Sequence, residues 1–587
     1  EETLLQPMNS EETFDVESKI KKCEDIKLDI DHCIIKRNCD PKKYYQWDEI
    51  DDEIGRGSFG VVYKIKNILF KQIRAMKQIC KSGLDREKNS LDFVNEIRIL
   101  RNLDHPNVIK IYELFEDENF FYIVTDYFSQ GNFLEKILKM DKNNDMKNEI
   151  FIGLMMFQIL SAVAYLHKNN IIHGDLKPEN IMMASDNNNY NSNSNYNSNS
   201  NSNSNSNLPF IRRKTFNTSI KFDLEEVNRQ IKNSPDRKNG KKNSYSHKEL
   251  LEEYLHSAKN FEFKNLANFQ IKLIDFGCSK ILSKKHYKYE DIIGTVSYMA
   301  PEVALNKYNE KCDIWSCGVI MFVLLTGEFP FEGETSKETH DNIINYKFNL
   351  QNDQLENISN SAIDLLKLLL TYDPNERISA KDALNHPFFS ENFNRNNIFN
   401  EKINCEEALI NIKNYYNDYF KNSKKNNYKL IRKFMDSYIS YNFINPAELE
   451  KIRKIFKLLD TNNDGMLSKR ELISAFEKYK IEINLEEIDE FLTKIKNKDN
   501  EFIEYEEFVK ISSNKKKLFS DENLKIAFKT LDEDNNGYIT KIELRYIFFK
   551  ECDLSNEIFN EFFEQFNSEE TDKIRLEDFL KVMKESN

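Results

Sequence analysis

The stretch His173-Gly174-Asp175-Leu176-Lys177-Pro178-Glu179-Asn180 decides how the rest of the chain is interpreted. Lys177 follows Asp175 by two residues and Asn180 follows it by five, so a proton acceptor, a cation and a metal ligand share one loop. This combination suits phosphoryl transfer. Asp175 would accept the proton of a substrate hydroxyl, Lys177 would steady the transferred phosphate, and Asn180 would hold a metal ion.

The bulk properties of the chain fit a multidomain protein. It has 587 residues and a formal net charge of −13 at pH 7. That length fits two or three domains, and the mildly acidic balance gives no reason to expect a nucleic-acid partner. The Cys residues are scattered without a C-x-x-C pair, which favours free thiols in a reducing compartment. We find no apolar run of the length that a membrane crossing needs, so we expect no transmembrane helix.

Residues 1–46 are polar and charged and predict a partly ordered extension. The segment contains three Cys and His32, but their spacing is too irregular for a zinc site, so we favour the extension. The sequence starts at Glu1 rather than Met, so a lipidation signal cannot be assessed. We expect a cytoplasmic monomer, which a lipid anchor ahead of Glu1 would attach to a membrane.

From Trp47 the pattern changes to alternating apolar residues. They enclose a G-x-G-x-x-G-x-V sequence, which predicts a β-hairpin whose glycines let the backbone approach phosphates. A dinucleotide-binding fold shares part of this pattern. The predicted ATP-contacting residues of the hairpin are Ile54, Gly55, Arg56, Gly57, Ser58, Phe59, Gly60, Val61 and Val62.

The next segments favour a phosphoryl-transfer site over a dinucleotide fold. Lys77 lies on a strand-like run, from which it can reach the α- and β-phosphates of ATP, and Glu96 lies on a predicted helix, placed to pair with it. Residues 120–128 predict a strand and hinge that hold adenine. A Thr at the end of that strand would border the back of the pocket, although Thr is also simply a good strand former. The predicted adenine-site residues are Thr125, Asp126 and Phe128.

Residues 149–168 predict a buried apolar helix. A low-complexity insertion follows the stretch 173–180, the predicted catalytic loop. The insertion, about 185–267, begins with a tract of Asn and Ser that predicts disorder, and it leaves from what would otherwise be a short hairpin turn. Within it, Arg212-Arg213-Lys214-Thr215 could be a phosphorylation site, but a solvated basic patch is the simpler explanation.

Asp275-Phe276-Gly277 follows the insertion, at the end of an apolar strand. Asp275 is predicted to hold, together with Asn180, the magnesium ion that bridges the phosphates of ATP. This completes a full set of residues for phosphoryl transfer. The predicted catalytic residues are Asp175, Lys177, Asn180, Asp275, Lys77 and Glu96.

A repeat occupies the last part of the chain. Leu467, Ile503, Ile539 and Ile574 recur at a nearly constant spacing, and each is followed four residues later by an acid. EF-hand calcium loops have this rhythm, because they place an apolar residue at position 8 and a carboxylate at position 12. The sequence therefore predicts four EF-hands, with loops 1 to 4 at 460–471, 496–507, 532–543 and 567–578.

Loops 1 and 3 carry oxygen ligands at the expected positions, three of them acidic in each loop, with Gly at position 6. In loop 2, ammonium groups at Lys496 and Lys498 would repel a cation, and loop 4 has Asp572 in place of Gly. We therefore expect two calcium sites, one in each pair of loops. The predicted ligands are Asp460, Asn462, Asp464, Met466 (backbone carbonyl), Ser468 and Glu471 in loop 1, and Asp532, Asp534, Asn536, Tyr538 (backbone carbonyl), Thr540 and Glu543 in loop 3.

Residues 390–445 connect the two regions and are rich in Asn, Lys and aromatic residues. Apolar residues near helical spacing predict a basic amphipathic helix over 411–443. Such a helix could bind the catalytic cleft or an EF-hand groove, or it could be a connector packed on one neighbour. Its flanking regions favour a binding role.

The order and separation of these motifs resemble the calcium-dependent protein kinases of plants and protists, over about 47–184 and 268–587. The resemblance implies an α+β bilobal kinase domain (47–389), a junction (390–445) that inhibits the kinase at low calcium, and an all-α calmodulin-like domain (446–587). It further implies a serine/threonine kinase that uses Mg²⁺ with ATP, acts on proteins and is activated by Ca²⁺. Calcium would open the EF-hand helix pairs, which would then bind the junction helix within the same chain.

Other positions match or depart from the family pattern. By resemblance, Gly294-Thr295 positions the substrate, Arg377 pairs with Glu302, and the helix that begins near Asp313 braces the catalytic loop. Gly174 replaces the Arg that binds a phosphorylated activation loop in many kinases, so we do not expect activation by loop phosphorylation. Asn132 replaces a Glu that often helps to bind an Arg of the substrate, whereas Glu179 is kept, which weakens the expected basic preference.

Two alternatives to an active kinase remain at this point. A pseudokinase scaffold that signals through its EF-hands is favoured only by Gly174. A calcium buffer is disfavoured by the two degenerate loops. The full set of phosphoryl-transfer residues favours the active enzyme.

Overall fold

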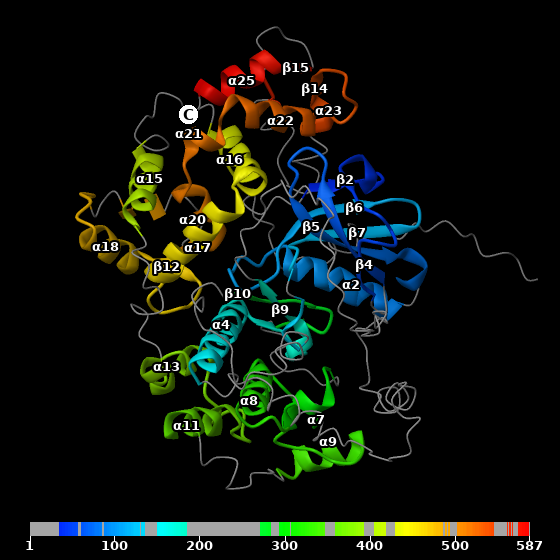
Figure 1. Cartoon of the computed structure of the whole chain (residues 1–587), viewed down its shortest axis with the longest axis vertical. Coiled ribbons are helices and arrows are strands. Elements are labelled where there is room, and N and C mark those ends of the chain that lie inside the picture. Colours follow the sequence, from blue (N-terminus) through cyan, green and yellow to red (C-terminus); the bar gives the residue numbers. More distant parts are fainter. Residues whose placement is uncertain are drawn as a thin grey trace, which may run out of the picture.

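The computed structural model of the chain (Figure 1) describes residues 35–56, 60–84, 87–129, 131–134, 149–184, 270–282, 293–305, 307–346, 358–392, 404–417, 429–484, 488–489, 491–492, 502–544, 560, 563–564, 566 and 573–585. The Asn/Ser-rich tract and Arg212 to Thr215 lie outside these residues. So do loop 2 before Phe502 and most of loop 4.

The N-terminal lobe is a seven-stranded sheet with the strand order β1-β6-β7-β5-β4-β2, and β3 pairs with β4. One helix, α2 (Glu87–Leu100), carries Glu96 beside β5. The strands are β1 (Ile35–Arg37), β2 (Tyr45–Gln46), β3 (Glu53–Arg56), β4 (Gly60–Asn67), β5 (Ile73–Cys80), β6 (Ile111–Glu116) and β7 (Phe120–Thr125).

Two of these strands come from the predicted extension. β1 pairs in parallel with β6, and β2 pairs with β4, so the sheet begins before Trp47. Arg37 is fully buried, donates to the Tyr44 hydroxyl at 2.9 Å and lies 3.7 Å from the Glu113 carboxylate. A buried guanidinium needs such partners, and they exist only once the sheet has formed.

The C-terminal lobe is built around α4 (Glu149–Lys168) and α8 (Lys311–Thr326). The core prediction for 149–168 is confirmed, since most α4 side chains are buried. α4 is long and apolar enough to cross a membrane, so the expectation that no apolar run of this length occurs is wrong. However, 72% of its most apolar window is buried in the lobe, so its apolar side chains already belong to the core. The surrounding helices are α7 (Pro301–Ala304), α9 (Ser336–Ile344), α11 (Asn360–Leu369), α12 (Ala380–Ala383) and α13 (Pro387–Asn392).

The insertion leaves and re-enters this lobe at one point. β9 (Ile181–Ala184) pairs antiparallel with β10 (Gln270–Leu273), and Ala184 lies opposite Gln270. The residues between them lie outside the described part of the chain. The two strands need only a short turn to connect them.

Deleting residues 186–265 is therefore expected to leave phosphate transfer largely intact, because Ala184 and Gln270 are already neighbours. Loop-closure entropy changes by only about 0.6 kcal/mol for each halving of loop length, so a gain of no more than about 2–3 kcal/mol in stability is expected. The specific activity of the purified deletion variant, measured beside the full chain, checks this. A collapse of activity in a folded variant would show that the insertion contributes to the kinase structure.

The C-terminal region contains two EF-hand pairs. β12 (Met466–Ser468) pairs with β13 (Phe502–Glu504), and β14 (Tyr538–Thr540) pairs with β15 (Lys573–Arg575). These short sheets place Leu467 opposite Ile503 and Ile539 opposite Ile574, so the predicted repeat positions join the loops in pairs. The flanking helices are α17 (Pro446–Leu459), α18 (Lys469–Lys478), α20 (Tyr505–Ser512), α22 (Asp521–Leu531), α23 (Lys541–Leu544) and α25 (Leu576–Glu585).

The junction belongs to the EF-hand core. Within the described residues it forms α15 (Glu406–Tyr416) and α16 (Lys429–Phe443). Leu409, Tyr416 and Ile439 are buried in one cluster with EF-hand side chains. In Figure 1, α16 lies between α15 and the N-terminal lobe. α15 contacts α20, and α16 contacts α20, α21 (Lys515–Leu518) and α22.

Candidate functional site

The catalytic loop, residues 173–180, is held in place by the side chain of Asp313 of α8. Its two carboxylate oxygens accept the backbone N–H groups of His173 and Gly174, each at 2.9 Å, and it also lies 2.9 Å from His167 Nε2. Burial acts to raise the pKa of Asp313, but the hydrogen bond and charge of His167, the charge of His173 and the Gly174 N–H outweigh it and lower the pKa. A charged, buried acceptor thus orients the loop. Asp313 was not among the predicted catalytic residues, although the helix that carries it was recognised.

Asp175 is the centre of the catalytic network. Its Oδ2 accepts from Lys177 Nζ at 2.7 Å and from Asn180 Nδ2 at 3.1 Å, and its Oδ1 accepts from the Thr295 hydroxyl at 2.8 Å. Lys177 also donates to Thr295 Oγ1 at 2.9 Å. Thr295 therefore joins the acceptor and the cation. Its Gly-Thr context signalled a role near the substrate, but it was not predicted to be catalytic.

Asn180 and Asp275 offer oxygens for a metal ion. The side-chain N–H group of Asn180 is used by Asp175, which leaves the Asn180 amide oxygen for a ligand role. Asp275 has φ 64°, a left-handed conformation that is unusual for a residue other than Gly or Asn. Phe276 is fully buried and packs on the His173 ring with centroids 4.9 Å apart, which holds Asp275 in place. Hard oxygen donors of this kind fit Mg²⁺.

Lys77 of β5 and Glu96 of α2 meet as predicted. Lys77 Nζ lies 3.4 Å from Glu96 Oε1. Burial alone would lower the pKa of Lys77, but the Glu96 and Asp275 carboxylates outweigh it and raise the pKa. Lys77 is therefore a cation at neutral pH, as a phosphate contact requires.

The predicted nucleotide hairpin is formed by β3 and β4, with Arg56 opposite Val61. Gly57, Ser58 and Phe59 lie outside the described residues, whereas Ile54, Gly55 and Val62 lie on the strands. A Cβ at Gly60 would come within 1.9 Å of the Gln78 carbonyl, so this position accepts only glycine.

The predicted adenine site follows β7. Thr125 is the last residue of that strand, and Phe128 lies in the segment after it. The Asp126 carboxylate pairs with Lys272 Nζ at 2.9 Å and accepts from the Tyr112 hydroxyl at 2.8 Å. This side chain is therefore part of a structural ion pair, and only the backbone of Asp126 is available for adenine.

Gly174 has a steric role. It has φ +80°, and a Cβ there would lie 2.5 Å from Ile293 Cδ1 and 2.9 Å from the Cys278 carbonyl. Gly294, with φ +86°, approaches the Gly174 carbonyl in the same way. The catalytic loop and residues 293–302, here called the substrate-side segment, thus touch through two glycines. Ile293 occupies space that a side chain at position 174 would need.

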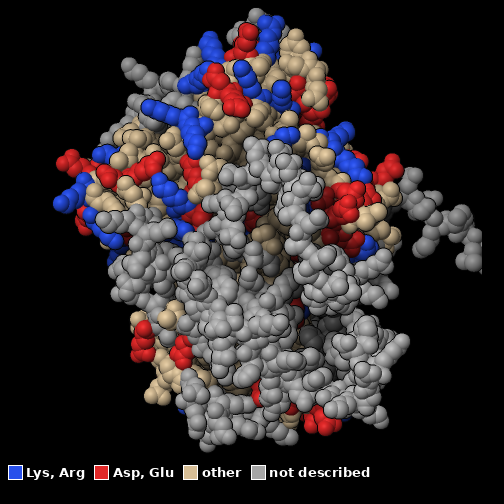
Figure 2. Space-filling view, viewed as in Figure 1, with Lys and Arg blue, Asp and Glu red and all other residues tan. Residues whose placement is uncertain are grey.

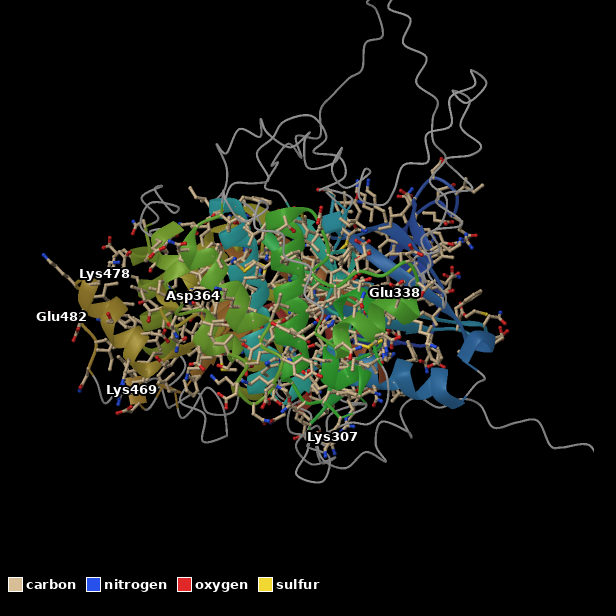
Figure 3. The ribbon with its side chains drawn as sticks, turned by 90° about the horizontal axis from the view of Figure 1, so that it is seen from below. Lys307, Glu338, Asp364, Lys469, Lys478 and Glu482 are labelled. Carbon is tan, nitrogen blue, oxygen red and sulfur yellow. The ribbon has the colours of Figure 1, made fainter. Side chains whose placement is uncertain are left out.

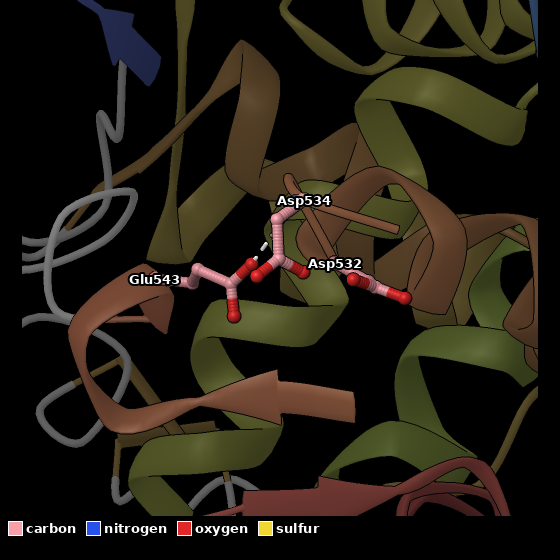
Figure 4. Close-up of side chains that lie close together, drawn as sticks. All are labelled: Asp532, Asp534 and Glu543. Atoms are coloured by element: carbon pink, nitrogen blue, oxygen red, sulfur yellow. Dashed lines mark hydrogen bonds between the residues drawn. The ribbon is translucent and has the colours of Figure 1, made fainter. Parts of the chain in front are cut away.

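Loop 3 brings its acidic ligands together (Figure 4). Ligand oxygens of Asp532, Asp534 and Glu543 lie within 4.8 Å of one another. Burial, a side-chain hydrogen bond with Asp534 and the charge of Glu543 together raise the pKa of Asp532. Converging carboxylates that repel one another are stabilised by a divalent cation, so the donor set fits Ca²⁺.

Loop 1 has the same internal pattern. The N–H of Gly465 donates to Asp460 Oδ2 at 3.0 Å, as Gly537 does to Asp532 Oδ2 at 2.9 Å. Glu471 Oε1 accepts the N–H of Thr461 at 2.8 Å, and Oε2 accepts the Ser468 hydroxyl at 2.7 Å. The side chains of Asn462 and Asp464 also lie on this loop. The two intact loops therefore share these internal hydrogen bonds, although among the described residues only the acids of loop 3 converge within 4.8 Å. The remaining predicted ligands, the Met466 and Tyr538 carbonyls and the side chains of Asn536 and Thr540, lie on the same two loops.

Loop 2 differs in its last position. Glu507 is buried and forms an ion pair with Lys510 at 2.5 Å, with both side chains less than 10% exposed. A neighbouring lysine therefore already neutralises this carboxylate, which fits the predicted absence of calcium. The remaining predicted features of loops 2 and 4, including Lys496 and Asp572, lie outside the described residues.

Comparison with known proteins identifies a kinase domain followed by EF-hands in this chain. The family model for the protein kinase domain matches residues 49–191 and 259–389, and the model for the EF-hand domain pair matches 449–513 and 521–584. The chain is 30% identical over 513 residues to calcium-dependent protein kinase 4 of Plasmodium berghei (strain Anka), covering 84% of the chain and 78% of that relative.

Two further relatives give the same result. Calcium-dependent protein kinase 4 of Plasmodium falciparum (isolate 3D7) is 30% identical over 510 residues, covering 84% of this chain and 78% of the relative. Calcium-dependent protein kinase 3 of Plasmodium yoelii yoelii is 29% identical over 502 residues, covering 85% and 74%. The α+β fold prediction and the resemblance are confirmed, and the pseudokinase alternative finds no support. The chain therefore belongs to the calcium-dependent protein kinases, with its kinase and EF-hand domains in one polypeptide.

Proposed function

We propose that this protein kinase transfers the γ-phosphate of ATP to Ser and Thr hydroxyls of proteins. The observation that carries the proposal is the network in which Asp175 is held by both Lys177 and Thr295. Asp175 would accept the proton of the substrate hydroxyl, and Lys177 would stay beside the transferred phosphate. Because Thr295 donates to the second carboxylate oxygen, it orients the acceptor.

The nucleotide would be bound by the β3–β4 hairpin and by Lys77. Lys77 would contact the α- and β-phosphates, held in place by Glu96 at 3.4 Å. Asn180 and Asp275 would hold Mg²⁺, whose charge would offset that of the phosphates. The side chains alone account for binding, orientation and proton acceptance.

We further propose two calcium sites, in loops 1 and 3, and none in loop 2. The matched hydrogen-bond patterns of Asp460 and Asp532 support the first part, and the Glu507–Lys510 pair supports the second. The junction helices α15 and α16 lie in the EF-hand core, which is the arrangement expected when the EF-hand domain, rather than the catalytic cleft, holds the junction.

The remaining expectations concern partners and location. We propose a cytoplasmic monomer without a nucleic-acid partner. On the face in Figure 2, Lys and Arg side chains of the described residues are interspersed with Asp and Glu. Such mixed charge does not favour a polyanion.

Phosphate transfer to peptides that differ only in Ser, Thr or Tyr at one position tests the proposed function. Each reaction is run with calcium and with a chelator. Transfer to Ser and Thr that depends on calcium is expected. Transfer to Tyr alone, or no transfer under either condition, would contradict the proposal.

Glu471→Gln and Glu543→Gln are each expected to weaken calcium binding at their own loop by about 10- to 100-fold, because each removes a charged ligand and an internal hydrogen-bond acceptor. The double variant should lose calcium activation while it keeps ATP binding. Calcium titrations of activity and of binding check both points. Full activation of the double variant would refute the assignment of loops 1 and 3 as the sensors.

A further inference from the structure

Loop 1 of the EF-hand domain rests on the kinase lobe. The Ser161 hydroxyl of α4 donates to the Asn463 carbonyl of loop 1 at 3.1 Å, and the Glu506 N–H of the paired loop 2 donates to Asp104 Oδ2 at 2.6 Å. Met466 is only 7% exposed and packs within the kinase core cluster. In Figure 1, β12 and α17 lie beside α4. A predicted calcium loop is therefore part of a contact between the two domains.

His105 makes this contact specific. The Asn107 N–H donates to His105 Nδ1 at 3.0 Å, so Nε2 carries the proton and faces Ser161 Oγ at 3.3 Å. A Cβ at Gly465, the turn residue of loop 1, would lie 2.2 Å from the His105 ring. Among the residues that the structure describes, no atom lies within 4 Å of a Cβ built on the equivalent Gly537 of loop 3. Loop 1 thus packs closely against the buried His105 ring, so its backbone position depends on the kinase lobe.

Lys168, the last residue of α4, reaches into loop 1. Its Nζ lies 3.1 Å from Asp464 Oδ2, 3.2 Å from Met466 Sδ and 4.2 Å from the centre of the Phe502 ring. Asp464 is the predicted ligand at position 5, and its Oδ1 accepts the Met466 N–H at 3.0 Å. Both oxygens of this ligand are therefore engaged, one of them by a cation from the kinase lobe.

Loop 3 provides the contrast. A kinase-lobe cation also touches it, since Arg37 pairs with Glu533 at 2.5 Å, but Glu533 is at position 2 and is not a ligand. At position 5, Asn536 accepts the Tyr538 N–H at 2.9 Å and donates to Asp534 at 2.7 Å, both within the loop. Each loop has three predicted acidic ligands. Loop 1 differs from loop 3 because a kinase-lobe cation, Lys168, directly contacts one of its predicted ligands.

We propose that Lys168 is a tethered competitor for the calcium site of loop 1, so that calcium binding at this loop and its docking on the kinase lobe oppose each other. An ammonium group on a ligand carboxylate both occupies a lone pair and repels a divalent cation. By linkage, calcium in loop 1 weakens the Lys168–Asp464 pair as much as that pair weakens calcium binding. Filling loop 1 therefore loosens its contact with α4. The inference rests on the proposed calcium ligation by loop 1.

The test uses the full chain with one loop disabled at a time. Glu543→Gln leaves loop 1 to report, and Glu471→Gln leaves loop 3. Calcium affinity is measured by competition with a chromophoric chelator, in each background with and without Lys168→Gln. We expect Lys168→Gln to lower the Kd of loop 1 by about two- to five-fold, the range for a partly exposed ion pair, and to leave loop 3 unchanged.

Lys307→Gln is the matched control, because it removes the same charge from an exposed residue. Lys307 is exposed, and Figure 3 shows it well separated from Lys469 of loop 1. It should change neither affinity. An unchanged or weaker loop-1 affinity in the Lys168 variant, or an equal shift in both loops, overturns the inference but not the proposed function. No calcium binding in the Glu543→Gln background overturns both.

Discussion

Replacing Asp175 with Asn is expected to lower kcat by about 10²- to 10⁴-fold, the usual contribution of a positioned general base. The substitution keeps the size of the side chain but removes the proton acceptor. It also removes the charge that holds Lys177 at 2.7 Å. Because Lys77, Glu96 and the nucleotide hairpin are untouched, the KM for ATP should change little. Steady-state phosphate transfer to a Ser peptide with saturating calcium measures both quantities.

Asp364→Asn is the control for this prediction. Asp364 lies on the surface of α11, where its side chain is 69% exposed beside His386. The same change of carboxylate to amide should leave kcat unaltered there. An Asp175→Asn enzyme with near-normal kcat and intact calcium binding would mean that another group accepts the proton.

Replacing Arg377 with Met is expected to destabilise the kinase lobe by about 3–5 kcal/mol, because it leaves the buried Glu302 carboxylate without its partner. Arg377 is fully buried, its Nη2 lies 2.9 Å from Glu302 Oε2, and it donates to the carbonyls of Thr371 and Lys311 at 2.8 and 2.7 Å. It thus ties the end of the substrate-side segment to α8 and to the loop after α11. Denaturant unfolding, monitored on the kinase transition, measures the loss.

Two further variants show whether the cost arises from the unpaired charge. Adding Glu302→Gln to Arg377→Met should recover part of the stability, because it removes that charge. Arg56→Met breaks an exposed pair with Glu53, in which the side chains are 48% and 26% exposed, and should cost less than about 1 kcal/mol. Similar losses for Arg56→Met and Arg377→Met would argue against a buried ion pair as the cause.

The structure also explains why position 174 of the catalytic loop is a glycine. The sequence shows only that an Arg is missing there. The structure shows a left-handed backbone and Ile293 in the space above it, so the missing side chain is replaced by an apolar contact. This contact can position the substrate-side segment without a phosphate, in keeping with control through calcium.

The sequence by itself determined the parts of the protein whose geometry is local. The spacing of Asp175, Lys177 and Asn180 placed them on one loop, and the ligand positions of each EF-hand loop are set by hydrogen bonds within about twelve residues. The pairing of Leu467 with Ile503 also followed from the repeat, because both positions must bury an apolar side chain at the same level. Such features survive in any fold that keeps the loop.

Only the tertiary structure decided the contacts between distant segments. β1 joins the sheet through Arg37, whose partners Glu113 and Glu533 come from two domains. Lys168 meets Asp464 across 296 residues of sequence. Polar residues such as these carry no periodic signal, because their role depends on which segments the apolar cores bring together. The sequence therefore specified a kinase and a calcium sensor, and the docking of one on the other specified how a kinase lysine can oppose calcium binding.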